Sequence, residues 1–386
     1  MTAPLILDIG LVLLAAAGGG WLARRIGLPA VVGYLAVGLV ISPFTPGYVA
    51  DRDQIHLLAD VGVALLLFEV GIEINIDRLR QEHRPLFLAA PVQVAITLAL
   101  SVGALMLAGL EPAAAGMIGL GIASSSSVVI VNITRSKRRT TDPPTERAML
   151  GWSVLQDIAV VVVSVVMLGF IGVNDRDPGL ALIEFGAFVV VALVVAWLLP
   201  RVLTALRGES DHFLIVSVAV ALAVAALGDY VFGVPLALAA FVAGLAISEG
   251  PTTSEARRRL LPFRDLFAVL FFVAVGSLID PTALMAQLPA LALVVGLVVV
   301  AKVGVSYVLA RAGGLPRPLQ LAVGLGQIGE FSFVIVSVGV TAGVVPAAWF
   351  AAVLGAVVLT IAGSAVVARM VGPSNEPSPT ATAAGL

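Results

Sequence analysis

The stretch MLGWSVLQDIAVVVVSVVMLGFIG occupies residues 149–172 and decides the fold. Asp157 is the only charged residue between Ala148 and Val173. At a rise of about 1.5 Å per residue, a helix of this length spans the hydrocarbon core of a bilayer and places Asp157 near its midplane. A carboxylate at that depth costs at least about 2.5 kcal/mol, so a functional role is the first hypothesis. A structural carboxylate that is paired with one buried cation is the alternative.

The rest of the chain also has the composition of a membrane protein. Its 386 residues are 60% hydrophobic and 12% charged, and the mean hydropathy is +1.08. Apolar runs of about 20 residues recur, which predicts an all-α polytopic membrane protein. We count thirteen candidate spans, at about 4–23, 29–43, 55–74, 85–109, 112–134, 145–173, 179–200, 211–228, 230–248, 262–280, 289–311, 318–343 and 346–370. Residues 372–386 are rich in Pro, Ser, Thr and Ala and are expected to be disordered.

Basic residues are distributed unequally between the two ends of these spans. If the N-terminus lies outside, 19 of the 22 lysines and arginines fall at the inner ends. Because basic loops remain in the cytoplasm, we predict a multi-pass protein of the inner (plasma) membrane, embedded in membrane lipid, with its C-terminus inside. The basic runs Arg135–Arg139 and Arg257–Arg259 are interpreted as topology signals, so no nucleic-acid partner is expected.

An internal duplication relates the two halves of the chain. Three pairs of segments match in the same order at an offset of 205 to 206 residues: PAVVGYLAVGLVIS (29–42) with PLALAAFVAGLAIS (235–248), Val70-Gly71 with Val275-Gly276, and IGLGIASSSSVVIV (118–131) with VGLGQIGEFSFVIV (323–336). This offset shifts the pattern by seven spans, and an odd shift reverses the direction of each copy across the membrane. The sequence therefore predicts two inverted repeats, the architecture of secondary transporters.

The best-matching pair of spans is also the least helix-like. Clusters of small residues occur in both, namely Gly116, Gly119, Gly121 and Ser124–Ser127 in the first, and Gly324, Gly326 and Gly329 in the second. Glycine and serine weaken a helix, and unwound backbone is tolerated in a membrane only where it lines a cavity or is buried in protein. We expect two discontinuous helices that cross beside Asp157 and present carbonyl oxygens to a small ion. Close helix packing is the alternative explanation of the glycines.

Three charges are expected near the midplane, and they should compensate one another. They are Asp157, Lys302 and Glu330. Lys302 could neutralise Asp157 directly or lie against the negative ends of the broken helices. Glu330 is expected to balance the positive half-helix ends rather than to bind the transported ion. The run GLGQIG at 324–329 fits a dinucleotide-binding pattern, but no strand precedes it, so we predict no nucleotide.

The stretches GLPAVVGYLAVGLVISP, LLLFEVGIEI, ASSSSVVIV, VLQDIAVV, LALAAFVAGLAIS, FFVAVGSLID and GQIGEFSFV resemble the monovalent cation:proton antiporter-2 family, the Kef-type and GerN-type exchangers. The resemblance implies a transmembrane exchanger domain over 1–371. Within it the resemblance implies a core of about 85–173 and 289–370, a scaffold of about 4–74 and 211–280, and a linker helix at about 179–200. It also implies a homodimer that exchanges Na⁺ or K⁺ for H⁺.

The same resemblance implies roles for individual residues. Asp157 would be the shared cation and proton site, with Gln156 beside it. The crossing helices would be lined by Ser125, Ser126, Ser127, Gln327 and Glu330. Lys302 is assigned as the compensating charge from its position near the midplane, not from the resemblance. The chain departs from the family pattern at Ser124, Ser127 and Glu69.

We predict from these observations a secondary active antiporter in which a monovalent cation and H⁺ compete for Asp157 as access alternates between the two sides. A Na⁺-coupled symporter of an organic anion on the same fold, or a cation channel, is the alternative. The sequence shows no nucleophile–base set, so neither an enzyme nor a cofactor is predicted.

Overall fold

The computed structural model describes residues 3–42, 44, 52–73, 85–134, 141–171, 178–205, 210–247, 253–329 and 331–371, and every regular element within these ranges is a helix. Each of the thirteen predicted spans overlaps a helix or an interrupted helix of the described residues. Within these ranges, six helices are long and apolar enough to cross a membrane, and shorter apolar helices of 10–17 residues accompany them. The prediction of an all-α fold built from apolar helices is confirmed.

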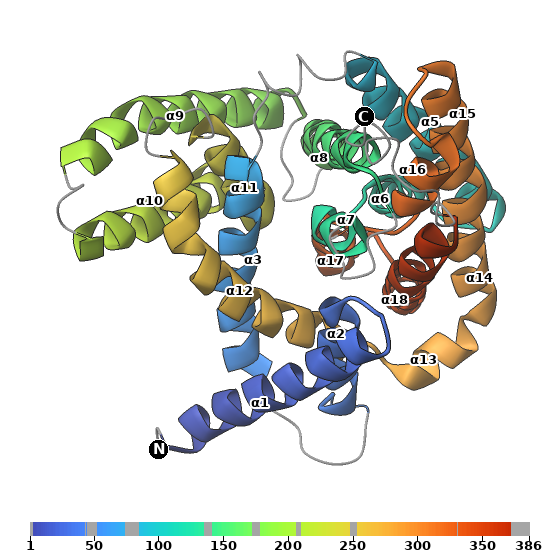
Figure 1. Ribbon diagram of the computed structural model, residues 1–386, viewed down its shortest axis with the longest axis horizontal. Coiled ribbons are helices and arrows are strands. Elements are labelled where there is room, and N and C mark those ends of the chain that lie inside the picture. Colours follow the sequence, from blue (N-terminus) through green and yellow to red (C-terminus); the bar gives the residue numbers. More distant parts are fainter. Residues whose placement is uncertain are drawn as a thin grey trace, which may run out of the picture.

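One bundle is formed by the helices α1 (Ala3–Arg25), α2 (Ala30–Val40), α3 (Arg52–Glu73), α10 (Ser210–Phe232), α11 (Leu236–Ile247) and α12 (Thr253–Ser277). We call it the first bundle. Its centre is α3, which packs along both α11 and α12, while α2 packs between α1 and α12. Figure 1 shows α3, α10, α11 and α12 together on one side of the molecule.

Two close helix contacts in the first bundle involve glycines at matching positions of the predicted repeats. A Cβ on Gly244 would lie 2.0 Å from the carbonyl oxygen of Phe68, and a Cβ on Gly38 would lie 2.1 Å from that of Val273. Gly38 and Gly244 are 206 residues apart, and Phe68 and Val273 are 205 apart. The approach of α3 to α11 thus has the same residue pattern as the approach of α12 to α2, as two copies of one unit would produce.

A second bundle contains α5 (Leu86–Leu107), α6 (Pro112–Ala123), α7 (Ser127–Thr134), α8 (Pro143–Ile171), α13 (Pro281–Ala286), α14 (Leu288–Leu297), the π-helical turn η1 (Val298–Val303), α15 (Gly304–Ala312), α16 (Pro318–Gly324), α17 (Phe331–Thr341) and α18 (Ala347–Met370). In this bundle α5 packs on α6 and α8, α6 packs on α17, and α18 packs on α14 and α16. These helices form the other side of Figure 1. Helix α9 (Pro178–Ala205) contacts α8 in the second bundle and α10 and α11 in the first.

Three details differ from the sequence-based boundaries. Helix α12 begins at Thr253 instead of near 262, and Pro262 lies inside it. Proline removes only one hydrogen bond of the helical ladder, so it marks a kink as readily as a start. Helix α10 continues to Phe232, where Gly233 (φ 63°) turns the chain toward α11. The π-helical turn in the predicted span 289–311 was not expected from the sequence.

Candidate functional site

The first interruption separates α6 from α7. Ser124 has extended backbone angles (φ −82°, ψ 150°) and ends α6, and its hydroxyl donates to the carbonyl of Gly121 at 3.1 Å. The hydroxyl of Ser126 accepts from the amide of Val129 at 3.3 Å, which caps the start of α7. The serine run therefore supplies the local hydrogen bonds that stabilise a helix end, in place of a continuous helical ladder.

The second interruption, between α16 and α17, lies directly against the first. The amide of Gly329 donates to the carbonyl of Ser124 at 3.1 Å. The side-chain amide of Gln327 makes two bonds to Ser126, accepting from its N–H at 2.9 Å and donating to its carbonyl at 3.1 Å. The hydroxyl of Ser125 donates to the carbonyl of Leu325 at 2.8 Å. Two helices that lie about 200 residues apart in sequence are thus joined at their breaks.

Gly329 is required by the closeness of this contact. A Cβ at this position would lie 2.7 Å from the carbonyl carbon of Ser125 and 3.0 Å from the amide nitrogen of Ser126. Both neighbours are backbone atoms and cannot rotate away. The close approach of the two interrupted segments therefore depends on the absence of a side chain at Gly329.

Lys302 lies between the ends of the two half-helices. Its side chain is fully buried, and its ammonium donates to the carbonyl of Ser124 and to the carbonyl of Gln327, the latter at 2.6 Å. These carbonyls follow the C-termini of α6 and α16, where the helix dipoles are negative. Of the two positions left open by the sequence, the structure therefore shows Lys302 against the negative ends of the broken helices.

Helix α8 brings the acidic residue to this crossing. The hydroxyl of Ser153 donates to the carbonyl of Ser125 at 3.2 Å. Gln156 and Asp157 follow three and four residues later and so share this face of α8. Asp157 is 1% exposed, and its charge interacts with that of Lys302. A buried carboxylate, a buried ammonium and the two helix breaks are thus parts of one site.

Helix α18 forms hydrogen bonds to the second interruption, between α16 and α17. The hydroxyl of Thr360 accepts from the amide of Ile328 at 3.2 Å, and the hydroxyl of Ser364 donates to the carbonyl of Val323 at 2.8 Å. The first bond gives the amide of Ile328 a partner, and the second adds to the bond that the carbonyl of Val323 accepts from the amide of Gly326 at 3.0 Å, so backbone groups at the break are satisfied within the protein. This matters in a membrane, where water is not present to satisfy them.

The residues predicted from the sequence have different outcomes. The structure brings Asp157, Ser125, Ser126, Gln327 and Lys302 together at the crossing. Gln156, beside Asp157 on α8, bonds to Gln93 of α5. Ser127 is the first residue of α7, and its side chain lies outside the described part of the structure. Glu330 also lies outside the described residues. The roles of all eight residues in cation and proton binding stay predictions.

A buried polar group on α5 was missed by the sequence analysis. Gln93 and Thr97 are fully buried and lie one helical turn apart. Gln93 accepts hydrogen bonds from the side-chain amide of Gln156 and from the indole of Trp152, the latter at 3.4 Å. The available signal was the spacing of Gln93, Thr97 and Ser101, which places three polar side chains on one face of an apolar helix.

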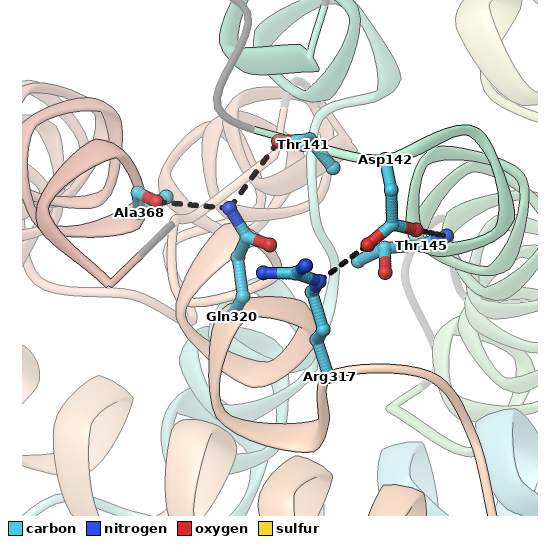
Figure 2. Close-up of polar contacts among 6 residues, drawn as sticks. All are labelled: Thr141, Asp142, Thr145, Arg317, Gln320 and Ala368. Carbon is cyan, nitrogen blue, oxygen red and sulfur yellow. Dashed lines mark hydrogen bonds and ion pairs between the residues drawn. The ribbon is translucent and has the colours of Figure 1, made fainter. Parts of the chain in front are cut away.

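A second polar cluster ties together three helix ends of the second bundle (Figure 2). Asp142 accepts from the amide of Thr145 at 2.8 Å, which caps α8, and forms an ion pair with Arg317 at the start of α16. Gln320 donates to Thr141 at 3.4 Å and to the carbonyl of Ala368 in α18 at 3.2 Å. The cluster fixes the start of α16 against α8 and α18.

The ionisation of Asp142 is adapted to this cluster. Partial burial alone would raise the pKa of the carboxyl. The hydrogen bonds from Thr145 and the charge of Arg317 outweigh burial and hold the pKa below its usual value. Asp142 is therefore ionised at neutral pH.

Two discontinuous helices that cross beside buried opposite charges define a class, the helical secondary transporters. The model of the transmembrane sodium/hydrogen exchanger family matches residues 11–371, and the chain belongs to this family. It is a multi-pass membrane protein.

Known proteins agree with this assignment. The chain is 30% identical over 359 residues to the "Putative cation/proton antiporter YbaL" of Escherichia coli (strain K12). This match covers 89% of the chain and 64% of the relative, so the chain spans less than two thirds of the relative's length.

Two solved structures of the sodium proton antiporter MjNhaP1 from Methanocaldococcus jannaschii share the fold. The match to the structure at pH 8 has a TM-score of 0.77 at 18% sequence identity, and it covers 95% of this chain and 98% of the MjNhaP1 chain. A three-dimensional electron microscopy map has a TM-score of 0.70 at 16% identity, with 96% of each chain covered.

Proposed function

We propose that this chain is a secondary active antiporter that exchanges a monovalent cation, Na⁺ or K⁺, for H⁺ at Asp157. The observation that carries the proposal is the burial of Asp157 beside the crossing of two interrupted helices whose carbonyls hold Lys302. A carboxylate within a membrane is costly, so it is found there mainly where it pairs with another charge or serves a function. The family of the chain supports cation:proton exchange as that function.

The chemistry is a competition at one carboxylate. Deprotonated Asp157, together with the side-chain oxygen of Gln156, offers hard oxygen ligands of the kind that alkali cations prefer. Protonation removes the charge of Asp157 and releases the cation. Either the cation or the proton neutralises the carboxylate of Asp157. Only with this charge neutralised does the site change its access from one side of the membrane to the other.

Lys302 determines the charge that moves in each half-cycle. If its ammonium stays on the carbonyls of Ser124 and Gln327 throughout, the site carries the same net charge with a cation bound as with a proton bound. Exchange is then one for one and electroneutral. If Lys302 also releases a proton, the exchange becomes electrogenic.

Alternating access assigns different roles to the two bundles. The second bundle, with residues 85–173 and 289–370, would be the moving core, and the first would be the scaffold, with α9 as the linker. In support, a cavity of about 540 Å³ lies between α3, α10, α11 and α12 on one side and α17 and α18 on the other, with Asp60 and Asp229 in its lining. We place the N-terminus outside and the C-terminus in the cytoplasm of the cell, and we expect a homodimer in the plasma membrane.

The test is exchange by the purified chain in liposomes that contain a pH-sensitive dye, with Na⁺ and K⁺ supplied separately across a range of pH. The wild type should move protons when a cation gradient is applied, and Asp157→Asn should not. Cation-driven proton movement that persists in Asp157→Asn would refute the assigned site. Current far above exchanger turnover would indicate a channel instead.

A further inference from the structure

We propose that Gln93 on α5 is a positioning residue that fixes the side-chain amide of Gln156, so that the oxygen of this amide is available as a cation ligand. Gln93, Thr97, Gln156 and the nearby Ser153 are all fully buried. The inference rests on the proposed function. It adds Gln93 of α5, a helix outside the two interrupted helices that form the crossing.

The direction of each hydrogen bond in this network is fixed by the groups at its two ends, the indole N–H of Trp152, which can only donate, and the carbonyl of Ala301, which can only accept. The indole N–H of Trp152 can only donate, so the atom of Gln93 that faces it must be the oxygen. The nitrogen of Gln93 then points to Thr97 and donates to its hydroxyl at 2.9 Å. The hydroxyl of Thr97 in turn donates to the carbonyl of Ala301 at 3.3 Å, and a carbonyl can only accept.

The fixed orientation of Gln93 decides the orientation of Gln156. Because the oxygen of Gln93 is the acceptor, Gln156 must present its nitrogen to it. The oxygen of Gln156 is buried and has no hydrogen-bond partner among the described residues. A buried amide oxygen of this kind is costly unless a ligand occupies it, and Gln156 is adjacent to Asp157. The network therefore selects the end of the amide that can bind a cation.

The same network reaches Lys302 through the backbone. Ala301 and Lys302 belong to the π-helical turn η1, and both are buried. A π-helical turn contains one extra residue and changes the face that the following residues present, which is why such turns occur at functional sites. The hydroxyl of Thr97, which lies on α5, bonds to the carbonyl of Ala301 in this turn. Ala301 directly precedes Lys302, whose ammonium bonds to both interrupted helices. Gln93 thus positions the amide of Gln156, while Thr97, which accepts from Gln93, positions the turn that contains Lys302.

The experiment uses the full chain in dye-loaded liposomes and measures the Na⁺ and K⁺ concentrations for half-maximal exchange in Gln93→Leu, Gln156→Leu and the double variant. Each single variant should raise this concentration about tenfold, the loss of one contact of hydrogen-bond strength, with a smaller change in maximal rate. The double variant should match Gln156→Leu, because Gln93 acts only through Gln156. Effects that multiply, or an unchanged half-maximal concentration in Gln93→Leu, would overturn the proposal.

A gentler pair of variants covers the case in which Gln93→Leu does not fold. Thr97→Val keeps the shape of the side chain but removes both the acceptor for Gln93 and the bond to the carbonyl of Ala301, so it should also raise the half-maximal cation concentration. Thr97→Ser keeps the hydroxyl and both bonds, and should retain most of the affinity. Equal effects of Val and Ser would contradict the inference. Asp157→Asn is measured alongside. Exchange that is independent of Asp157 refutes the proposed function, while exchange that depends on Asp157 but is insensitive to Gln93 and Thr97 refutes only this inference.

Discussion

Replacing Gln327 by methionine tests whether its side chain holds the two interrupted helices together. Methionine has a similar length but makes neither bond to Ser126. The carbonyl of Ser126 keeps a donor, because the amide of Ile130 also reaches it at 3.2 Å. The N–H of Ser126 loses the acceptor that Gln327 provides. Leaving a buried N–H unsatisfied costs about 1–3 kcal/mol and the second bond is worth about 1 kcal/mol, so Gln327→Met should destabilise the chain by about 2–4 kcal/mol.

Thermal unfolding in detergent, followed by the fluorescence of the four tryptophans, measures this loss. The midpoint of Gln327→Met should fall on the order of 5 °C, and exchange in liposomes should be lost with it. Ser337→Ala is the matched control, because it removes a side-chain bond within α17 alone, to Val334 at 3.0 Å. Its midpoint should stay within about 1 °C of the wild type. If Gln327→Met melted like this control, the side chain of Gln327 would not be what joins the helices.

Two further predictions concern the crossing and the cluster of Figure 2. Gly329→Ala should abolish exchange, because its Cβ would meet backbone atoms at 2.7–3.0 Å, whereas Gly363→Ala, with nothing within 4 Å, should exchange normally in the same liposomes. If Gly329→Ala were fully active, the close approach would not be needed. Asp142→Asn keeps the helix cap but loses the ion pair with Arg317, and should cost no more than about 1 kcal/mol at neutral pH, because both side chains are about a third exposed. The pKa of Asp142 is lowered in the folded chain, so the contribution of the carboxylate is complete above its unfolded pKa of about 3.9 and is lost as the pH falls through the folded value. The difference in melting temperature between the wild type and Asp142→Asn should therefore shrink below about pH 4, and a constant difference would argue against the ion pair.

The sequence predicts the helices and their breaks because these depend on local features. Long apolar runs must be helical in a membrane, and the clusters around Ser124 and Gly326 weaken a helix whatever surrounds them. The place of Asp157 within one long helix, α8, follows from the apolar run that surrounds it. Composition and length were sufficient for these features.

Other parts of the site depend on contacts that no local pattern records. The spacing of Gln93, Thr97 and Ser101 marks a polar face on α5, but the partner of Gln93, Gln156, lies 63 residues away, and no local pattern identifies it. The turn VVVAKV at 298–303 contains no helix-breaking residue, and its π-helical form accompanies the bond from Thr97 to Ala301. The partners of Lys302 could not be chosen from sequence because the negative half-helix ends and Asp157 are both suitable for a cation.

The position of Lys302 in the chain has a consequence for how the protein is made. One of its acceptors, Ser124, is synthesised 178 residues earlier, and the other, Gln327, follows it by 25 residues. When the lysine enters the bilayer during translation, one half of its coordination is already in the membrane and the other half has not yet left the ribosome. A chain that stopped short of Gln327 would hold a buried ammonium with an incomplete set of acceptors. The site that begins at Ser124 is therefore completed only when the segment around Gln327 has been inserted.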